Sequence, residues 1–196
     1  MSRLIIAIEG PSGIGKSELL RRLMPSLAKR APPFQATSNV ETTSLQPLIR
    51  ELARSEKPGI ALCLALAAAR ALLLERTTGN LLVDRYVLSS LVYQTFSGID
   101  REYIYQINAP LLAGVVTVAL EARAQVIAGR RETRQSNQSD FFKRSLGLED
   151  EIALYGEGIA FLRARGHPVI SVNANEDAAA TAMKVADIIG RLDIAS

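Results

Sequence analysis

One short stretch near the N-terminus constrains this chain more than any other. Residues 10–17 read Gly-Pro-Ser-Gly-Ile-Gly-Lys-Ser, which fits the pattern Gly-x-x-x-x-Gly-Lys-Ser. An apolar run precedes the stretch and a helical pattern follows it, which is the strand–loop–helix order that the motif requires. Glycines let backbone N–H groups turn around an anion, and the start of a helix adds partial positive charge. The stretch therefore predicts a loop that binds a nucleoside triphosphate.

The residues of this loop have distinct predicted roles. Lys16 is placed to reach the β- and γ-phosphates, and the Ser17 hydroxyl is placed to ligate Mg²⁺. The predicted ATP contacts are Gly10, Ser12, Gly13, Ile14, Gly15, Lys16 and Ser17. The expected cofactors are therefore ATP and Mg²⁺, with Ser17 as one metal ligand.

Composition limits the class of protein. The 196 residues suffice for one domain with a substantial core, and 48% of them are hydrophobic. The net charge of +3 is too small and too dispersed to indicate nucleic-acid binding. The longest apolar stretch, 60–74, is broken by Arg70 and is too short to cross a bilayer, and no secretory signal is recognisable. We expect one cytoplasmic domain over 1–196 with neither nucleic-acid nor membrane partner, and a buried, inert Cys63.

Short apolar runs alternate with helical patterns along the whole chain. Strands are predicted near 4–9, 34–38, 81–84, 115–120 and 168–173, each followed by a helical segment. This alternation indicates a parallel sheet with helices on both faces. The predicted fold class is α/β, with three layers in the order α/β/α around a five-stranded parallel sheet.

Two of the predicted helices carry detailed expectations. A helix over 141–165 contains Gly147, Gly156 and Gly158, which are expected to mark breaks or bends. The closing helix, 176–191, has an amphipathic pattern. Its inward-facing side chains are predicted to include Ala179, Met183, Ala186 and Ile189.

The third predicted strand ends in residues typical of a catalytic site, Asp84 and Arg85. A carboxylate at the tip of a core strand can hold Mg²⁺, and an adjacent arginine can form bidentate hydrogen bonds with a phosphate. We therefore predict Asp84 as a metal ligand together with Ser17, although an ion pair at the strand end is the structural alternative. On the following helix Ser90 and Tyr93 are three residues apart, so both can face one cleft.

Three further polar features have a functional and a structural interpretation. Glu41 follows the second strand. It either lies at the sheet edge where ligands bind or is an ordinary loop carboxylate. Arg70 lies in a long apolar helix over 60–77 and either reaches solvent or points into a polar cavity. Residues 130–144 are polar and contain several basic residues, which predicts a mobile lid over the phosphates or else a solvated surface.

Residues 84–94, taken with the loop, resemble the thymidylate kinase family. That family has Asp-Arg and then Tyr or Phe after its third strand, followed by Ser-Ser and Tyr-Gln, and this chain reads Asp-Arg-Tyr-Val-Leu-Ser-Ser-Leu-Val-Tyr-Gln. Glu9 before the loop, Arg70, and the two phenylalanines at 141–142 extend the resemblance over most of the chain. The resemblance implies a P-loop NTPase fold and ATP-dependent phosphoryl transfer to a nucleoside monophosphate such as dTMP, in a divergent member.

The resemblance also implies roles for individual residues. The implied catalytic residues are Lys16, Asp84, Arg85, Arg131 and Arg134, with Arg130 as an alternative lid arginine. The implied substrate contacts are Glu41, Leu66, Arg70, Arg85, Ser90 and Tyr93. Members of the family usually form dimers, and the apolar helix at 60–74 is the expected site of a dimer seam.

Three departures from the family pattern concern the acceptor. Ser12 stands where the family commonly has an acid, and residues 40–44 keep only Glu41 from the usual Arg-Glu-Pro-Gly-Gly. Leu66 stands where the family has an aromatic side chain that stacks on the base, and leucine lacks π-stacking, which contributes about 0.5–1.5 kcal/mol between aromatic rings. These departures predict a changed acceptor or weaker thymidylate activity.

Two other functions stay open at the level of sequence. A kinase that phosphorylates a hydroxyl, such as that of a (deoxy)nucleoside, needs a base, and Glu41 is placed to serve as one. A nucleotide-binding module without catalysis is the second alternative. The presence of Lys16, Ser17 and Asp84 argues against this second alternative.

Overall fold

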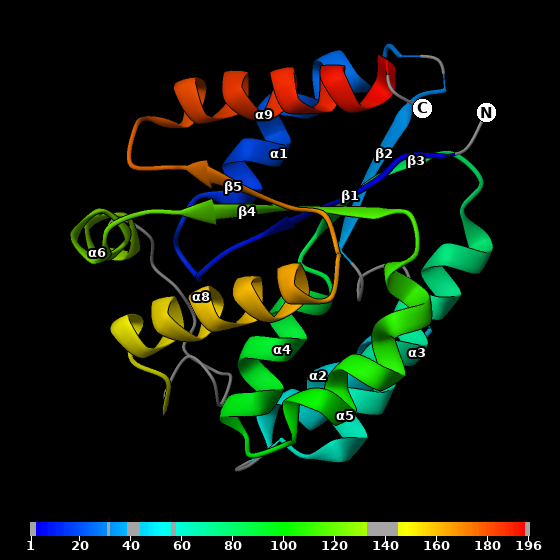
Figure 1. The fold of residues 1–196 in the computed structure, drawn as a ribbon, viewed down its shortest axis with the longest axis vertical. Coiled ribbons are helices and arrows are strands. Elements are labelled where there is room, and N and C mark those ends of the chain that lie inside the picture. The colour runs from blue at the N-terminus through cyan, green and yellow to red at the C-terminus, as the bar shows by residue number, and fades with distance from the viewer. Residues whose placement is uncertain (1–2, 31, 39–43, 56–57, 133–144, 195–196) are drawn as a thin grey trace.

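A five-stranded parallel sheet forms the centre of the molecule (Figure 1). The computed structural model describes residues 3–30, 32–38, 44–55, 58–132 and 145–194. The strand order is β2-β3-β1-β4-β5, and all four neighbouring pairs are parallel. The strands are β1 (Ile5–Glu9), β2 (Phe34–Ser38), β3 (Asn80–Asp84), β4 (Val115–Glu121) and β5 (Val169–Asn173). The predicted fold class is confirmed, and each predicted strand has nearly the predicted ends.

Helices cover both faces of the sheet. On one face lie α1 (Lys16–Leu27) and α9 (Ala178–Ile194) (Figure 1). The helices on the other face are α3 (Ile60–Arg76), α4 (Val87–Phe96), α5 (Arg101–Asn108) and α8 (Leu148–Ala164). The shorter helical elements are α2 (Gln46–Arg54), the 3₁₀ helix η1 (Ala109–Leu112) and α6 (Ala124–Glu132). Within the described part of the chain, no helix is long and apolar enough to cross a membrane.

The sheet separates two hydrophobic clusters. Side chains of β1 alternate between them, because successive residues of a strand point to opposite faces. Ile5 and Ala7 pack with the α4 and α8 side of the core, whereas Ile6 and Ile8 pack with the α1 and α9 side. All five residues of β1 are buried, so the loop that follows this strand starts from a rigid support. Cys63 is fully buried in the first of these clusters, as predicted.

The helix α8 is continuous where the sequence predicted a break. It runs through Gly156 and Gly158 from Leu148 to Ala164. A glycine inside a helix costs only about 1 kcal/mol relative to alanine, which the packing of α8 outweighs. Gly158 also permits a close approach between helices, because a Cβ there would lie 2.7 Å from the Leu88 Cδ1 atom of α4. The predicted break at Gly147 is confirmed, because α8 begins directly after it. The predicted breaks at Gly156 and Gly158 were wrong, and Gly158 serves packing instead.

The inward face of α9 also differs from the prediction. The buried stripe contains Ala182, Val185 and Ile189, whereas Met183 is 69% exposed. Of the predicted residues, Ile189 is correct, and Ala186 is half-buried and packs against the same cluster. Ala179 and Met183 are exposed, so these two were wrong. Two neighbouring stripes of this helix have similar alanine-rich composition, so hydrophobicity alone did not distinguish them.

Candidate active site

The central strands bring the two predicted motifs side by side. β1 leads into the phosphate-binding loop at Gly10, and the neighbouring strand β3 ends at Asp84. Ile8 pairs with Asp84 in the sheet, and the Arg85 N–H donates to the Ile8 carbonyl at 3.0 Å. Parallel strands place their carboxyl ends at one edge, and this edge is where ligands bind in such folds. The loop and Asp84-Arg85 are thus neighbours in the structure.

The loop has a backbone shape that requires its glycines. Gly10, Gly13 and Gly15 have φ angles of 142°, 84° and 111°, in the region that favours glycine. Space is also limited, because a Cβ at Gly13 would lie 2.5 Å from the Arg131 Cγ atom. The loop leads directly into α1, whose first residue is Lys16. Its amide groups therefore turn around an anion-binding concavity beside a helix N-terminus.

Lys16 is folded back onto the loop and is only 6% exposed. Its Nζ donates to the carbonyls of Gly10 at 2.7 Å and Pro11 at 2.9 Å. Burial, and next the positive charge of Arg85, lower the pKa of Lys16 from its ordinary value to about 7. Nearby carboxylates oppose this shift, those of Asp84, Glu9 and Glu151. A phosphate bound in the loop would therefore stabilise the charged ammonium form of this lysine.

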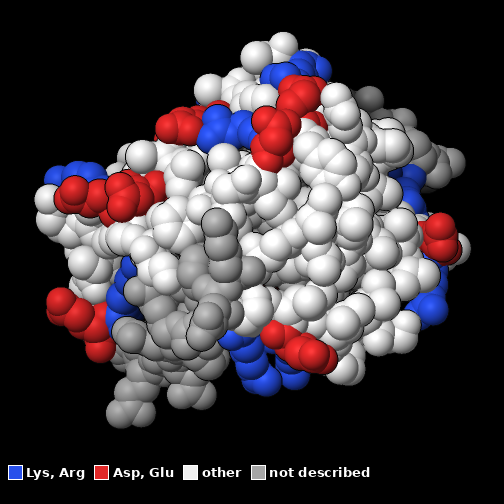
Figure 2. Space-filling model, turned by 90° about the horizontal axis from the view of Figure 1, so that it is seen from below, with Lys and Arg blue, Asp and Glu red and all other residues white. Residues whose placement is uncertain are grey.

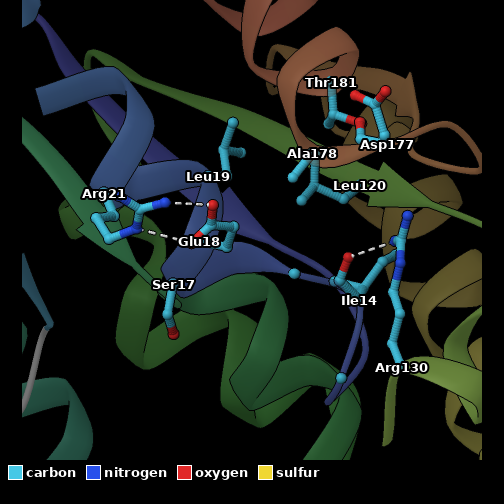
Figure 3. Close-up of a pocket in the computed structure, with 12 residues that line it drawn as sticks. Ile14, Ser17, Glu18, Leu19, Arg21, Leu120, Arg130, Asp177, Ala178 and Thr181 are labelled. Atoms are coloured by element: carbon cyan, nitrogen blue, oxygen red, sulfur yellow. Dashed lines mark hydrogen bonds and ion pairs between the residues drawn. The ribbon is translucent and has the colours of Figure 1, made fainter. Parts of the chain in front are cut away.

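A pocket of about 550 Å³ opens beside the loop and the start of α1 (Figure 3). Its wall includes Ile14 of the loop and Thr181 of α9. Arg130 crosses the pocket wall, with NH1 donating to the Ile14 carbonyl at 2.8 Å and NH2 to the Glu176 carbonyl at 2.6 Å. This volume lies within the range of small-ligand sites.

Asp84 and Ser17 provide oxygen atoms suited to a hard cation. The Asp84 Oδ1 atom is buried and has no hydrogen-bond partner among the described residues. Ser17 lies in the first turn of α1 and lines the pocket (Figure 3). Over the described ranges, no group of three or more His, Cys, Asp or Glu side chains is arranged to hold a metal. Phosphate oxygens and water would have to complete a Mg²⁺ shell, as is usual for this ion.

Arg85 has an unusual backbone conformation, with φ of 66°. It is the one non-glycine residue with positive φ in the described part of the chain, and such a conformation costs about 1–2 kcal/mol. Its NH1 donates to the hydroxyls of Tyr93 at 2.9 Å and Tyr155 at 2.8 Å, and lies 3.5 Å from the Gly10 carbonyl oxygen. The left-handed turn after β3 therefore directs this guanidinium toward the start of the loop.

Glu9 was not predicted as a site residue, yet it fixes the turn that carries Arg85. Its carboxylate is fully buried and accepts the N–H groups of Tyr86 at 2.6 Å and Ser89 at 3.0 Å. It also accepts the Ser89 hydroxyl at 2.5 Å. These N–H groups belong to the first turn of α4, so a side chain of β1 caps that helix. The available signal, an acid at the end of an apolar strand, is too common to identify this role.

Glu151 of α8 is a second residue that sequence reasoning missed. Its side chain is 4% exposed and accepts the Ser12 N–H at 2.8 Å and the Tyr93 hydroxyl at 2.5 Å. The other carboxylate oxygen forms an ion pair with Arg131. Three consecutive acids occupy the first turn of α8, a position that acids favour in any helix, so the pattern did not single out the buried one. They are Glu149, Asp150 and Glu151.

Arg70 does not reach solvent, because it is 1% exposed. Its NH1 donates to Asn108 Oδ1 at 2.7 Å, and its NH2 donates to Ser90 Oγ at 2.6 Å and to the Tyr86 carbonyl at 2.9 Å. The Nε atom has no partner among the described residues. Leu66, one turn earlier on α3, packs against a small hydrophobic cluster of α2 and α3. The structure thus brings Arg70 and Ser90 together, and Tyr93 lies with Arg85.

Part of the predicted lid and one predicted acid lie outside the described residues. Of the segment 130–144, the structure describes 130–132, at the end of α6. Arg131 lies against the loop, with its Nε donating to the Ser12 carbonyl at 2.9 Å. Arg134 and Glu41 are outside the described residues.

The model of the thymidylate kinase family matches residues 8–152. This range contains the loop, the Asp84-Arg85 pair and both buried acids, Glu9 and Glu151. The chain belongs to the thymidylate kinase family. It is therefore an ATP-dependent nucleoside monophosphate kinase, and the predicted family and enzyme class are confirmed.

Individual members of the family are distant relatives. A probable thymidylate kinase from Caldivirga maquilingensis is 25% identical over 181 residues, which cover 87% of this chain and 86% of that protein. A thymidylate kinase from Bacillus cytotoxicus is 30% identical over 167 residues, covering 74% and 80%. The structure of thymidylate kinase from Candida albicans has a TM-score of 0.71 at 17% identity, over 97% of this chain and 92% of that one. These identities agree with the prediction of a divergent member.

Proposed function

We propose that this kinase transfers the γ-phosphoryl group of ATP to a nucleoside monophosphate of the thymidylate type, yielding a nucleoside diphosphate and ADP. The observation that carries the proposal is the position of Arg85, whose guanidinium lies 3.5 Å from the Gly10 carbonyl at the start of the donor loop. An acceptor that already carries a phosphate needs a cation beside it rather than a base. A guanidinium is suited to such a phosphate because it can donate two parallel hydrogen bonds.

The proposed step requires alignment and charge neutralisation. An oxygen of the acceptor phosphate attacks the γ-phosphorus, the bond to the β–γ bridging oxygen breaks, and ADP leaves. Lys16 exchanges its loop carbonyls for the β- and γ-phosphates. Arg131, which contacts the Ser12 carbonyl, lies where it can neutralise the migrating group. The attacking oxygen is already ionised, so no general base is required.

We expect Ser17 and Asp84 to hold Mg²⁺, directly or through water. The buried Asp84 Oδ1 without a described partner supports this assignment. When bound, the ion neutralises charge on the β- and γ-phosphates. Asp84 itself also lowers the cost of keeping Lys16 charged, since its carboxylate raises the pKa of that lysine.

Arg70, Ser90, Tyr93 and Leu66 are the proposed contacts of the acceptor nucleoside. Arg70 and Ser90 are joined by a hydrogen bond of 2.6 Å, and the Arg70 Nε remains an unused donor among the described residues. Leu66 would pack on the base without π-stacking. The Candida albicans thymidylate kinase is described as having broad substrate specificity, so acceptors other than dTMP belong in the test.

The test is ATP consumption with a panel of acceptors: dTMP, dUMP, other nucleoside monophosphates, and the corresponding nucleosides. We expect turnover with monophosphates and none with nucleosides. Arg85→Met should lower the acceptor kcat/KM by about 10² or more, whereas Glu41→Gln should have little effect. The reverse pattern would indicate a hydroxyl acceptor with Glu41 as the base. If the protein binds ATP but consumes none with any acceptor of the panel, it is a nucleotide-binding module without catalytic activity.

We further propose a homodimer formed through α2 and α3. Among the described residues, three of the four exposed large hydrophobic side chains lie on these helices, Leu48, Ile60 and Leu64. Figure 2 shows an area without Lys, Arg, Asp or Glu among the described residues of the face seen from below. One domain over 1–196, a lid at 130–144 and a cytoplasmic location stay predictions.

A further inference from the structure

The carboxylate of Glu151 occupies a position on the phosphate-binding loop that an anion would take. It accepts the backbone N–H of Ser12 at 2.8 Å. The N–H groups of such a loop are the ligands of nucleotide phosphates. A carboxylate is an anionic acceptor like a phosphate oxygen. A side chain from α8 therefore offers Ser12 the kind of anionic acceptor that a phosphate group would supply.

Arg131 is held by the same carboxylate. One of its guanidinium nitrogens pairs with Glu151, and its Nε donates to the Ser12 carbonyl at 2.9 Å. Its stem lies against Gly13, where even a Cβ would come within 2.5 Å of the Arg131 Cγ atom. The arginine is 32% exposed, so it borders solvent above the loop. Glu151 thus already neutralises the positive charge of Arg131, which could otherwise pair with a phosphate group.

The carboxylate also reaches the acceptor side of the site. Glu151 accepts the Tyr93 hydroxyl at 2.5 Å, and that hydroxyl accepts a hydrogen bond from Arg85 at 2.9 Å. One buried side chain thereby joins the donor loop to the arginine proposed for the acceptor. A buried carboxylate costs free energy unless it is paired and hydrogen-bonded. Arg131, Ser12 and Tyr93 supply this pairing for Glu151. The same negative charge repels any phosphate that enters the loop.

We propose that Glu151 is a positioning residue that holds Ser12 and Arg131 in the nucleotide-free enzyme and is replaced at both by phosphate oxygens when nucleotide binds. Glu151 and the nucleotide then compete for the same donors. A glutamate with a purely structural role would stabilise the free and bound forms alike and would not oppose binding. The inference rests on the proposed binding of nucleotide phosphates at 10–17.

The test measures the affinity of Glu151→Gln and of the wild type for ADP and for inorganic pyrophosphate by calorimetric titration. Glutamine keeps the volume and an acceptor oxygen but removes the charge. We expect about tenfold tighter binding of both ligands, the size of one charge-assisted hydrogen bond partly offset by solvation. Glu157→Gln is the matched control, because Glu157 lies on the same helix and forms an exposed pair with Arg101. Its affinity should equal that of the wild type.

Unchanged or weaker binding by a folded Glu151→Gln protein would overturn the inference. Folding is checked by far-UV circular dichroism and thermal melting. Should that variant not fold, Glu151→Asp serves instead, since it keeps the charge but is too short to reach Ser12 and Arg131 together; it should bind more tightly than the wild type. If the wild type binds neither ligand, the proposed function of the loop fails; if it binds both and the variants show no gain, this inference alone fails.

A double-mutant cycle tests whether a nucleotide phosphate replaces Glu151 as the partner of Arg131. Arg131→Met should weaken ADP binding, and in this background Glu151→Gln should give a gain clearly smaller than tenfold. The reason is that the two side chains share one interaction, so their effects are not additive. An equal gain in both backgrounds would show that Glu151 does not compete for Arg131.

Discussion

Lys16 shows how a single residue is prepared for phosphate binding. Its Nζ donates to the Gly10 and Pro11 carbonyls, and burial together with Arg85 lowers its pKa to about 7. A bound phosphate would favour the charged form and raise the pKa again. Nucleotide binding above pH 7 should therefore take up a proton, and affinity should fall as pH rises from about 7 toward 10.

We predict an uptake close to one proton when ADP binds at pH 8. With a pKa of about 7, roughly nine-tenths of Lys16 is neutral at that pH. Calorimetric titration in two buffers of different ionisation enthalpy measures the uptake. Lys16→Arg is the control, because a guanidinium stays charged and should show almost none. Equal uptake by this variant would assign the proton to another group.

The junction between β1, β3 and α4 shows how elements place a catalytic side chain. Tyr86, the residue at the start of α4, makes no side-chain capping hydrogen bond, and the cap comes from Glu9 of β1. The strained turn at Arg85 lies directly before this cap. A contact with the interior of the sheet thus keeps Arg85 in a conformation that the residue would otherwise avoid.

We predict that Glu9→Gln lowers the free energy of unfolding by about 1–3 kcal/mol, because a buried charged cap is lost. It should lower the acceptor kcat/KM far more than the affinity for ADP, since Arg85 loses its support. Urea unfolding and steady-state kinetics measure both. Ser89→Ala, which removes one hydroxyl partner, should have the smaller effect in each. Lower stability with unchanged acceptor kinetics would contradict the positioning role.

The two glycines of α8 offer a matched test of helix packing. Gly156 has open space at its Cβ position, whereas a Cβ at Gly158 would meet buried Leu88 at 2.7 Å. Gly156→Ala should raise the free energy of unfolding by about 0.5–1 kcal/mol. Gly158→Ala should lower it by about 1 kcal/mol, because overpacking exceeds the helix gain. Chemical denaturation of both variants gives the difference. Equal effects would show that α8 and α4 separate easily.

At the scale of the whole molecule, the exposed apolar residues are distributed unevenly. Ile60 and Leu64 lie one turn apart on α3, and Leu48 adds a third apolar side chain from α2. Met183, also exposed, lies on α9, which covers the opposite face of the sheet. A surface with several grouped large apolar side chains is typical of an interaction site, whereas a single one is ordinary.

We predict a dimer of the wild-type protein at micromolar concentration, measured by light scattering after size exclusion. Leu64→Glu should give a monomer, because it places a charge in the buried seam. Met183→Glu should remain a dimer, because it makes the same change on the other face. A monomeric wild type, or dissociation by Met183→Glu alone, would show that α2 and α3 are not the interface.

Much of the architecture followed from the sequence alone, for a physical reason. A parallel strand buried on both faces is a continuous apolar run, as in the five buried residues of β1, and such runs are easily recognised. Because parallel strands share one carboxyl edge, the loop and Asp84-Arg85 could be expected to meet there. Helix details were less predictable: the exposure of Met183 and the continuity of α8 at Gly158 depend on which neighbour each helix meets.

The phosphate-binding loop, the order of the elements and the family were determined by the sequence, because each depends on residues close together in the chain. The surroundings of that loop were decided only by the tertiary structure. The partners of Glu151 lie 20, 58 and 139 residues away, and Glu9 meets α4 across 77 residues or more. Local patterns carry no information on such distances. An acid at a strand end or in a first helical turn acquires its role only when folding brings it to the loop.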